Sequence, residues 1–285
     1  AKLRGICRQK KIGHTGTLDP QATGVLPVCL GSATRACEML TDRTKEYVAE
    51  LLLGKITDTQ DTTGTVLEER EVAVDEAQVR EVIGSFVGGY DQIPPMYSAL
   101  KVNGKKLYEL ARAGKEVERQ ARHVDLPAIE ILEIRLPVVK FRVECSKGTY
   151  IRSLCADIGG KLGCGGTMQS LVRTRVGEFR LTDALTLTQL QELRDTGRLE
   201  EALLPTDRIF ADFNAVHVEE KWRKLIDNGN AFYPGQTMEQ TTYPVGEWVR
   251  VYREDDSFVG IYAYDGAKEW YKPVKIFHSN TESRK

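Results

Sequence analysis

Residues 11–26 read KIGHTGTLDPQATGVL, and this is the stretch from which the fold is best worked out. Glycines at 13, 16 and 24 permit backbone angles and close approaches that other residues forbid. Pro20 disfavours the helical region for Asp19, and apolar residues resume at Val25 in a short strand predicted over 24–30. A polar loop therefore presents one carboxylate beside a strand, which is how rigid scaffolds often display reactive groups. Taken alone, however, an Asp-Pro pair is more often an ordinary turn.

Composition places the chain among globular proteins, with 285 residues of which 41% are hydrophobic and 28% charged. No apolar run approaches the roughly 20 residues of a membrane helix, and the N-terminal residues lack the apolar core of a secretory signal. The six cysteines form no Cys-x-x-Cys pair, and the four histidines do not have zinc-finger spacing. We therefore expect a reduced, cytoplasmic protein with no metal site and no membrane association.

Charge is concentrated locally although the net charge is only −1, a value that argues mildly against a nucleic-acid binder. Residues 1–13 carry five basic side chains and no acidic one. Residues 101–122 carry seven basic and three acidic side chains, a net charge of +4. Two basic segments on a neutral body suit a protein that meets phosphate on one face. Two solvated surface segments are the alternative, and for charge runs alone they are the commoner case.

Periodicity predicts most elements of the first 204 residues. Alternating apolar positions indicate strands over 44–54, 129–134 (with one irregularity) and 139–145. Helical spacing indicates helices from 75 to about 87, from 107 to 111 and from 150 to 162. We expect Ser32 to cap a helix through residue 40, and Thr186 with Gln189 to form a capping box. The Thr-rich acidic loop 57–64 lacks the ligand set of a calcium loop and is interpreted as a turn.

The chain beyond Pro205 has a different pattern, and we place a domain boundary there. A helix is predicted over 218–228, closed by Gly229, followed by strands over 248–253, 258–264 and 270–277. A helix with a small β-meander is typical of an accessory domain rather than a catalytic one.

The run from residue 13 to residue 26 resembles the signature loop of the bacterial TruB family, the tRNA pseudouridine-55 synthases. Segments around 44–54, 92–108, 148–154 and 171–175 are also similar to that family, so the resemblance is firm over 11–175 and looser beyond. It implies an α+β pseudouridine synthase fold with a mixed, mainly antiparallel central sheet flanked by helices. It also implies a catalytic domain over 1–204 and a β-rich, PUA-like RNA-binding domain over 205–285. Family sequences normally start earlier, so we expect the N-terminal strand to be missing here.

The resemblance also implies roles for individual residues. In the family, the loop aspartate, here Asp19, is catalytic, and an arginine, here Arg152, pairs with it. Tyr47 and Tyr150 match tyrosines that lie against the target base, Leu171 matches a residue of the uracil pocket, and His14 would hold or displace the flipped base. Without the resemblance, Tyr47 and Leu171 would be core residues and Arg152 an exposed helix arginine. Candidates for contact with the RNA backbone are Lys101, Lys105 and Lys106.

The implied reaction isomerises uridine to pseudouridine at position 55 in the T loop of tRNA, after the base is flipped into a pocket. The N1–C1′ bond breaks, the base rotates, and it rejoins through C5, so we expect no cofactor and no metal. Arg152 would keep Asp19 ionised, whether Asp19 attacks the ribose, attacks the uracil ring or acts as a base. The expected partner is the tRNA T stem-loop, with a monomer and no obligatory protein partner. Alternative functions are an RNA chaperone, which could also be a secondary role, an Asp-dependent hydrolase, and a relative that uses guide RNA.

Overall fold

The computed structural model describes residues 1–102 and 104–277, and chain contacts divide it into two units that interleave in sequence. The sheet unit holds residues 16–27 and 41–184. The C-terminal unit holds residues 1–15, 28–40 and the chain from 185 onward. The functional division expected between residues 204 and 205 stays a prediction.

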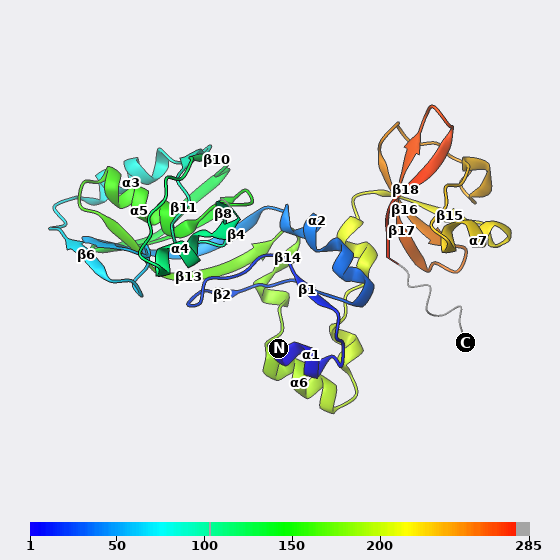
Figure 1. Cartoon of the computed structure of the whole chain (residues 1–285), viewed down its shortest axis with the longest axis horizontal. Helices are drawn as coiled ribbons and strands as arrows, with labels where there is room; N and C mark the ends of the chain where they lie inside the picture. The colour runs from blue at the N-terminus through cyan, green and yellow to red at the C-terminus, as the bar shows by residue number, and fades with distance from the viewer. Residues whose placement is uncertain (103, 278–285) are drawn as a thin grey trace. The chain divides into compact units, whose positions relative to one another are not determined.

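The sheet unit is organised on one large sheet with strand order β11-β12-β4-β13-β14, to which β2 is added beside β13 (Figure 1). All its pairs are antiparallel except β2 with β13, so the predicted mixed, mainly antiparallel sheet is confirmed. The strands are β2 (Thr23–Gly24), β4 (Lys45–Leu53), β11 (Ala128–Arg135), β12 (Val138–Cys145), β13 (Gly166–Val176) and β14 (Phe179–Arg180).

Alternation of apolar residues along the central strands directs one row of side chains into the core. In β4, Ala49, Leu51 and Leu53 are buried, and β12 buries every second residue from Val139 to Cys145. The irregularity predicted in the strand before β12 is present, as a register shift between Ile131 and Glu133 of β11. The period-2 pattern therefore identified these strands correctly.

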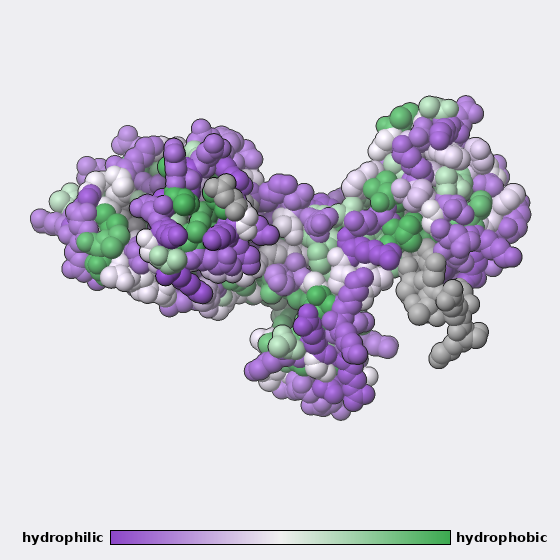
Figure 2. Space-filling model, in the orientation of Figure 1, coloured by the Kyte–Doolittle hydropathy of each residue, from purple (hydrophilic) through white to green (hydrophobic). Residues whose placement is uncertain are grey.

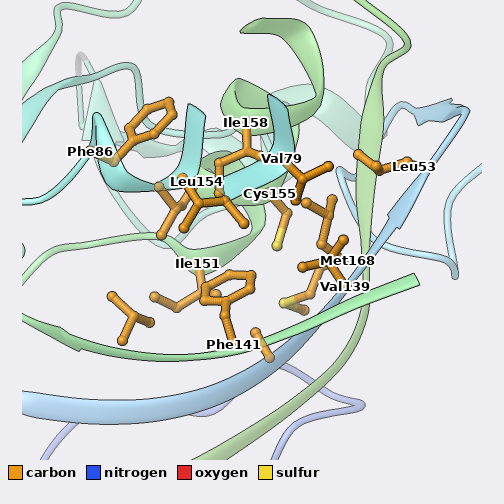
Figure 3. Packing of buried hydrophobic residues seen from close by; sticks show 14 of the residues in the cluster. Leu53, Val79, Phe86, Val139, Phe141, Ile151, Leu154, Cys155, Ile158 and Met168 are labelled. Carbon is orange, nitrogen blue, oxygen red and sulfur yellow. The ribbon is translucent and has the colours of Figure 1, made fainter. Parts of the chain in front are cut away.

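Two helices cover this buried face of the sheet, α3 (Glu76–Gly84) and α5 (Ile151–Lys161) (Figure 1). Figure 3 shows their apolar side chains meeting those of the strands, with Val79, Leu154 and Ile158 above Phe141 and Met168. Helix α3 begins where predicted, because Asp75 accepts a hydrogen bond from the Gln78 N–H in a capping box. It ends at Gly84, before the glycine pair at 88–89.

Smaller elements extend the sheet unit. Three two-stranded pieces pair β5 (Lys55–Thr57) with β6 (Val66–Glu69), β7 (Tyr90–Gln92) with β10 (Arg122–Val124), and β8 (Lys101–Val102) with β9 (Lys105–Lys106). Helix α4 (Leu107–Arg112) follows β9, as its apolar spacing predicts, and a 3₁₀ turn η2 (Leu181–Asp183) follows β14.

The C-terminal unit contains the predicted β-rich part, a sheet of order β15-β16-β17-β18. Strands β16 (Trp248–Arg253), β17 (Phe258–Asp265) and β18 (Trp270–Ile276) match the three predicted strands. The predicted helix over 218–228 is wrong in its first part, because β15 (Asn214–Val218) runs parallel to β16 and the helix α7 covers only Arg223–Asp227. Val216 and Val218 are buried with His217 between them, an alternation that indicates a strand.

The remaining elements of this unit are short. Helix α1 (Lys2–Ile6) precedes β1 (Ile12–His14), which pairs with β3 (Val28–Leu30). The strand expected over 24–30 is thus divided, with Pro27 between β2 and β3. Ser32 caps nothing, because a 3₁₀ turn η1 (Gly31–Ala36) leads into α2 (Cys37–Thr41). Helix α6 (Leu187–Asp195) has the predicted Thr186–Gln189 capping box. Further 3₁₀ turns are η3 (Leu199–Ala202), η4 (Thr206–Phe210), η5 (Glu220–Trp222) and η6 (Pro234–Gln236).

Within residues 1–102 and 104–277, no helix has both the length and the apolar character required to cross a bilayer.

Candidate active site

The loop that carries Asp19 is a tight turn held against strand β13. The Ala22 N–H donates to the Asp19 carbonyl at 2.9 Å, which closes a turn with Pro20 in its second position. Gly24 has a φ of +115°, and a Cβ added there would lie 2.2 Å from the Arg173 carbonyl oxygen. Glycine is therefore required at 24 for both its backbone angle and the close approach of β2 to β13. The turn leaves the Asp19 side chain 34% exposed.

Arg152 pairs with Asp19 through two parallel hydrogen bonds. Its Nε donates to Asp19 Oδ2 at 3.0 Å and its Nη2 donates to Asp19 Oδ1 at 3.1 Å. The Arg152 side chain is only 6% exposed, in the first turn of α5, so it is not the exposed helix arginine of the alternative interpretation. A bidentate guanidinium fixes the plane of the carboxylate.

The other Arg152 donors are also used. Nη1 donates to the Thr59 carbonyl at 3.0 Å, and Nη2 donates to the Tyr97 carbonyl at 2.9 Å. Nη1 also lies 3.6 Å from Asp61 Oδ2, so a second carboxylate shares the same cation. A guanidinium has five N–H groups in a planar fork, and here the partners on three sides hold that plane rigidly.

Asp61 is a site residue that sequence reasoning missed, because its loop was interpreted only as a turn. Its Oδ1 accepts hydrogen bonds from Thr59 Oγ1 at 2.8 Å and from the Thr63 N–H at 3.0 Å, and its side chain is 14% exposed. The threonines on either side of Asp61 were the available signal, since they fix its carboxylate in one orientation.

Tyr47, Leu171 and Arg173 lie side by side on the helix-covered face of the sheet. Tyr47 of β4 pairs with Arg173 of β13, and Ala49 pairs with Leu171, which is 7% exposed. Burial raises the pKa of the Tyr47 phenol, and the charge of Asp19 acts in the same direction while Arg173 opposes it. Tyr47 is half-buried at the edge of the core rather than enclosed in it.

Arg173, a second missed residue, holds both arms of the Asp19 loop. It is 1% exposed, and its Nε donates to the Val25 carbonyl at 2.7 Å while its Nη2 donates to the Gly16 carbonyl at 3.3 Å. The Val25 N–H in turn donates to the Arg173 carbonyl at 2.8 Å. These bonds enclose residues 16–25, so Arg173 determines where the loop lies on the sheet.

The remaining predicted residues are placed as follows. Tyr150 is half-buried at the N-cap of α5, two residues before Arg152. His14 is exposed at the end of β1 and belongs to the C-terminal unit, so the structure does not test its predicted role.

The three lysines predicted to contact the RNA backbone lie on the β8–β9 hairpin. Lys101 and Lys105 are exposed, and Lys101 pairs directly with Lys106 across the two strands. Lys106 Nζ donates to the Tyr108 hydroxyl at 3.2 Å. Like charges opposite each other destabilise a hairpin, and an anionic ligand would relieve that repulsion. Figure 2 shows that the visible face around these elements is largely hydrophilic, with apolar patches between the polar side chains.

The sheet unit therefore presents the Asp19 carboxylate in a fixed orientation and partly exposed. Aromatic side chains lie on two nearby elements, Tyr47 on β4 and Tyr150 at the start of α5. Such a carboxylate can act as a nucleophile or as a base toward a ligand that reaches it from solvent. The tyrosines offer ring faces of the kind on which a nucleobase stacks.

Comparison with known proteins gives matches over nearly the whole chain. Residues 4–151 match the model of the TruB family pseudouridylate synthase N-terminal domain, and residues 152–211 match that of the tRNA pseudouridylate synthase B C-terminal domain. The chain is 51% identical to a tRNA pseudouridine synthase B of Lachnoclostridium phytofermentans, over 97% of this chain and 94% of that one. It is 49% identical to the Alkaliphilus oremlandii protein of the same name, over 96% and 90% of the two chains.

Solved structures show the same fold. A chain in an H/ACA ribonucleoprotein bound to a substrate RNA containing 2′-deoxyuridine superposes with a TM-score of 0.71 and 25% identity, over 98% of this chain and 80% of that one. A chain of a Cbf5-Nop10-Gar1 complex gives a TM-score of 0.71 and 27% identity, with the same coverage. The predicted fold class is thus confirmed by comparison as well as by topology.

Proposed function

Because the chain belongs to the TruB family of pseudouridylate synthases, and is therefore an isomerase, we propose that it converts uridine 55 in the T loop of tRNA to pseudouridine with Asp19 as its catalytic residue. The observation that carries this proposal is the bidentate pair, with distances of 3.0 and 3.1 Å, between a buried Arg152 and a partly exposed Asp19. A carboxylate that reacts with a nucleobase must be reachable from solvent and held in one orientation, and Asp19 meets both conditions.

We assign the other residues the roles that the family resemblance implies. Tyr47 and Tyr150 replace the stacking that a uridine loses when it leaves the T loop, and Leu171 supplies an apolar wall. Lys101, Lys105 and Lys106 contact RNA phosphates, whose binding by counterion release weakens with added salt. His14 assists displacement of the base. The β-rich sheet of the C-terminal unit is the PUA-like accessory RNA-binding module.

The chemistry fits one carboxylate and one guanidinium. The glycosidic N1–C1′ bond breaks and a C5–C1′ bond forms, so the atoms of substrate and product are the same and only a proton moves from C5 to N1. Arg152 pairs with Asp19, and Asp61 shares the same guanidinium. The six cysteines are free, as in a reducing compartment, so we assign the protein to the cytoplasm. We assign tRNA as its substrate and a monomer as the acting species.

The direct test is incubation with unmodified tRNA and with an isolated T stem-loop, followed by chemical mapping of pseudouridine. We expect product at position 55 only, and we expect Asp19→Ala to abolish it while tRNA binding survives. Product at another uridine would overturn the assignment of the site, and substantial turnover by Asp19→Ala would overturn the assignment of the residue.

A further inference from the structure

Helix α5, which carries Arg152, starts at a residue that caps helices poorly. Its N-cap is Tyr150, with φ −103° and ψ 108° and no hydrogen bond from its own side chain to the helix. N-caps are normally Ser, Thr, Asp or Asn, whose short side chains bind the free N–H groups of the first turn. The orientation of Tyr150 and of the first turn must therefore be determined by another part of the chain.

Gln92, the last residue of β7, supplies the missing contacts. Its Oε1 accepts a hydrogen bond from the Tyr150 N–H at 2.8 Å, and its Nε2 donates to the Tyr150 carbonyl at 3.0 Å. One buried side-chain amide, 1% exposed, thus pairs with both backbone groups of the N-cap residue, as a neighbouring strand would.

The direction of this amide is fixed by a second pair of groups. Gln92 Nε2 also donates to the Tyr90 hydroxyl at 2.6 Å, and that hydroxyl donates to Asp157 Oδ2 at 2.8 Å. Because Tyr90 gives its only proton to Asp157, its oxygen accepts, and the amide must turn its NH₂ group toward it. Burial raises the pKa of Tyr90, which keeps the phenol protonated for this purpose.

We propose that Gln92 is a positioning residue for the isomerisation: it holds the Tyr150 backbone so that the Tyr150 ring faces the base and Arg152 meets Asp19. This inference rests on the proposed function of the site. The same segment reaches the site a second time, because the carbonyl of Tyr97, five residues further on, accepts a hydrogen bond from Arg152.

The first test replaces the amide by a group of similar length with no donor, Gln92→Met. The matched control is Gln78→Met, which removes the corresponding side chain from the capping box of α3. We expect Gln92→Met to lower the single-turnover rate about tenfold to a hundredfold, with tRNA affinity unchanged, because it removes both hydrogen bonds to the Tyr150 backbone and leaves a buried N–H without an acceptor. The control should keep its full rate.

The second test uses Gln92→Glu. When the new side chain is protonated, it can accept from the Tyr150 N–H and donate to the Tyr150 carbonyl. When it is ionised, its negative carboxylate faces the Tyr150 carbonyl and cannot donate to it. Ionisable groups around position 92 are Tyr90 on the same strand, Asp157 and Cys155 on α5, and Arg122, its partner on β10. Burial and Asp157 both favour the acid form. The rate of Gln92→Glu relative to the natural chain should therefore fall as pH rises, and a ratio that does not change with pH would overturn the proposal.

A third measurement does not depend on activity. Amide hydrogen exchange in peptides covering residues 148–156 should accelerate in Gln92→Met and stay unchanged in the control, since the Tyr150 N–H loses its acceptor. Unchanged exchange, or a natural single-turnover rate in folded Gln92→Met, would refute the role. If Gln92→Met does not fold, the pH series decides. Failure of the natural chain to form pseudouridine would instead refute the proposed function, and the exchange result would still report on the N-cap.

Discussion

Replacing Arg152 by lysine keeps the positive charge and removes the planar fork. The guanidinium gives two hydrogen bonds to Asp19, at 3.0 and 3.1 Å, and one each to the carbonyls of Thr59 and Tyr97. An ammonium is a point charge with three donors, so it cannot keep the bidentate contact and also reach both carbonyls.

The expected losses of reaction rate and of stability in Arg152→Lys follow from these contacts. A hydrogen bond to a charged group contributes about 1.5–3 kcal/mol, and the lower end applies because Asp19 is 34% exposed. Loss of one such bond in the transition state slows the reaction about tenfold, and release of the carboxylate from its fixed plane extends this to about a hundredfold. One part-buried carbonyl left without a donor should lower the free energy of unfolding by about 1 kcal/mol.

The assay is the single-turnover rate of pseudouridine formation, with urea unfolding measured on the same preparations. Arg70→Lys is the matched control, because Arg70 makes a bidentate pair with Glu68, at 2.7 and 2.8 Å, on an exposed surface. We expect the control to change neither quantity appreciably. A folded Arg152→Lys enzyme that reacts within about threefold of the natural rate would refute the argument that the fork orients Asp19.

Substitutions at three other positions, with a control at Gly84, test separate parts of the structure. Gly24→Ala should lower the free energy of unfolding by more than about 2 kcal/mol and remove most of the activity. The control is Gly84→Ala, whose added Cβ meets no atom within 4 Å, and thermal unfolding should show it to be neutral or stabilising. Tyr47→Phe should react within about threefold of the natural rate and Tyr47→Ala about tenfold to a hundredfold more slowly, if its ring stacks on the base; equal single-turnover rates would reduce its role to packing. Burial raises the pKa of Asp157 in the folded chain, so above that pKa its ionised form lowers the free energy of unfolding. Asp157→Asn should therefore raise the free energy of unfolding by up to about 1 kcal/mol at neutral pH. Urea unfolding at a series of pH values should show this gain shrinking as the pH falls toward the pKa that Asp157 has in the unfolded chain.

Much of the fold could be predicted from the sequence because periodicity and capping are properties of single segments. Alternation in β4 and β12, and the capping boxes of α3 and α6, involve residues at most a few positions apart. The same local reasoning failed at two places. It overlooked the alternation of residues 214–218, which form a strand parallel to β16, and it expected Ser32 to cap a helix where the backbone instead turns into η1.

At the site, the Asp19 loop was identified by its resemblance to a family loop, because its glycines, proline and lone carboxylate taken alone are more often an ordinary turn. The resemblance also named Arg152 as the partner of Asp19, but only the tertiary structure decided the geometry in which Arg152 holds that carboxylate. Arg152 is 133 residues away from Asp19, and Gln92 is 58 residues away from Tyr150. Such contacts depend on the register of β4 with β13 and on the seating of α5 on the sheet, and no local pattern encodes a distance between segments. The candidate carboxylate could therefore be predicted from the chain, whereas its orientation is a property of the folded sheet.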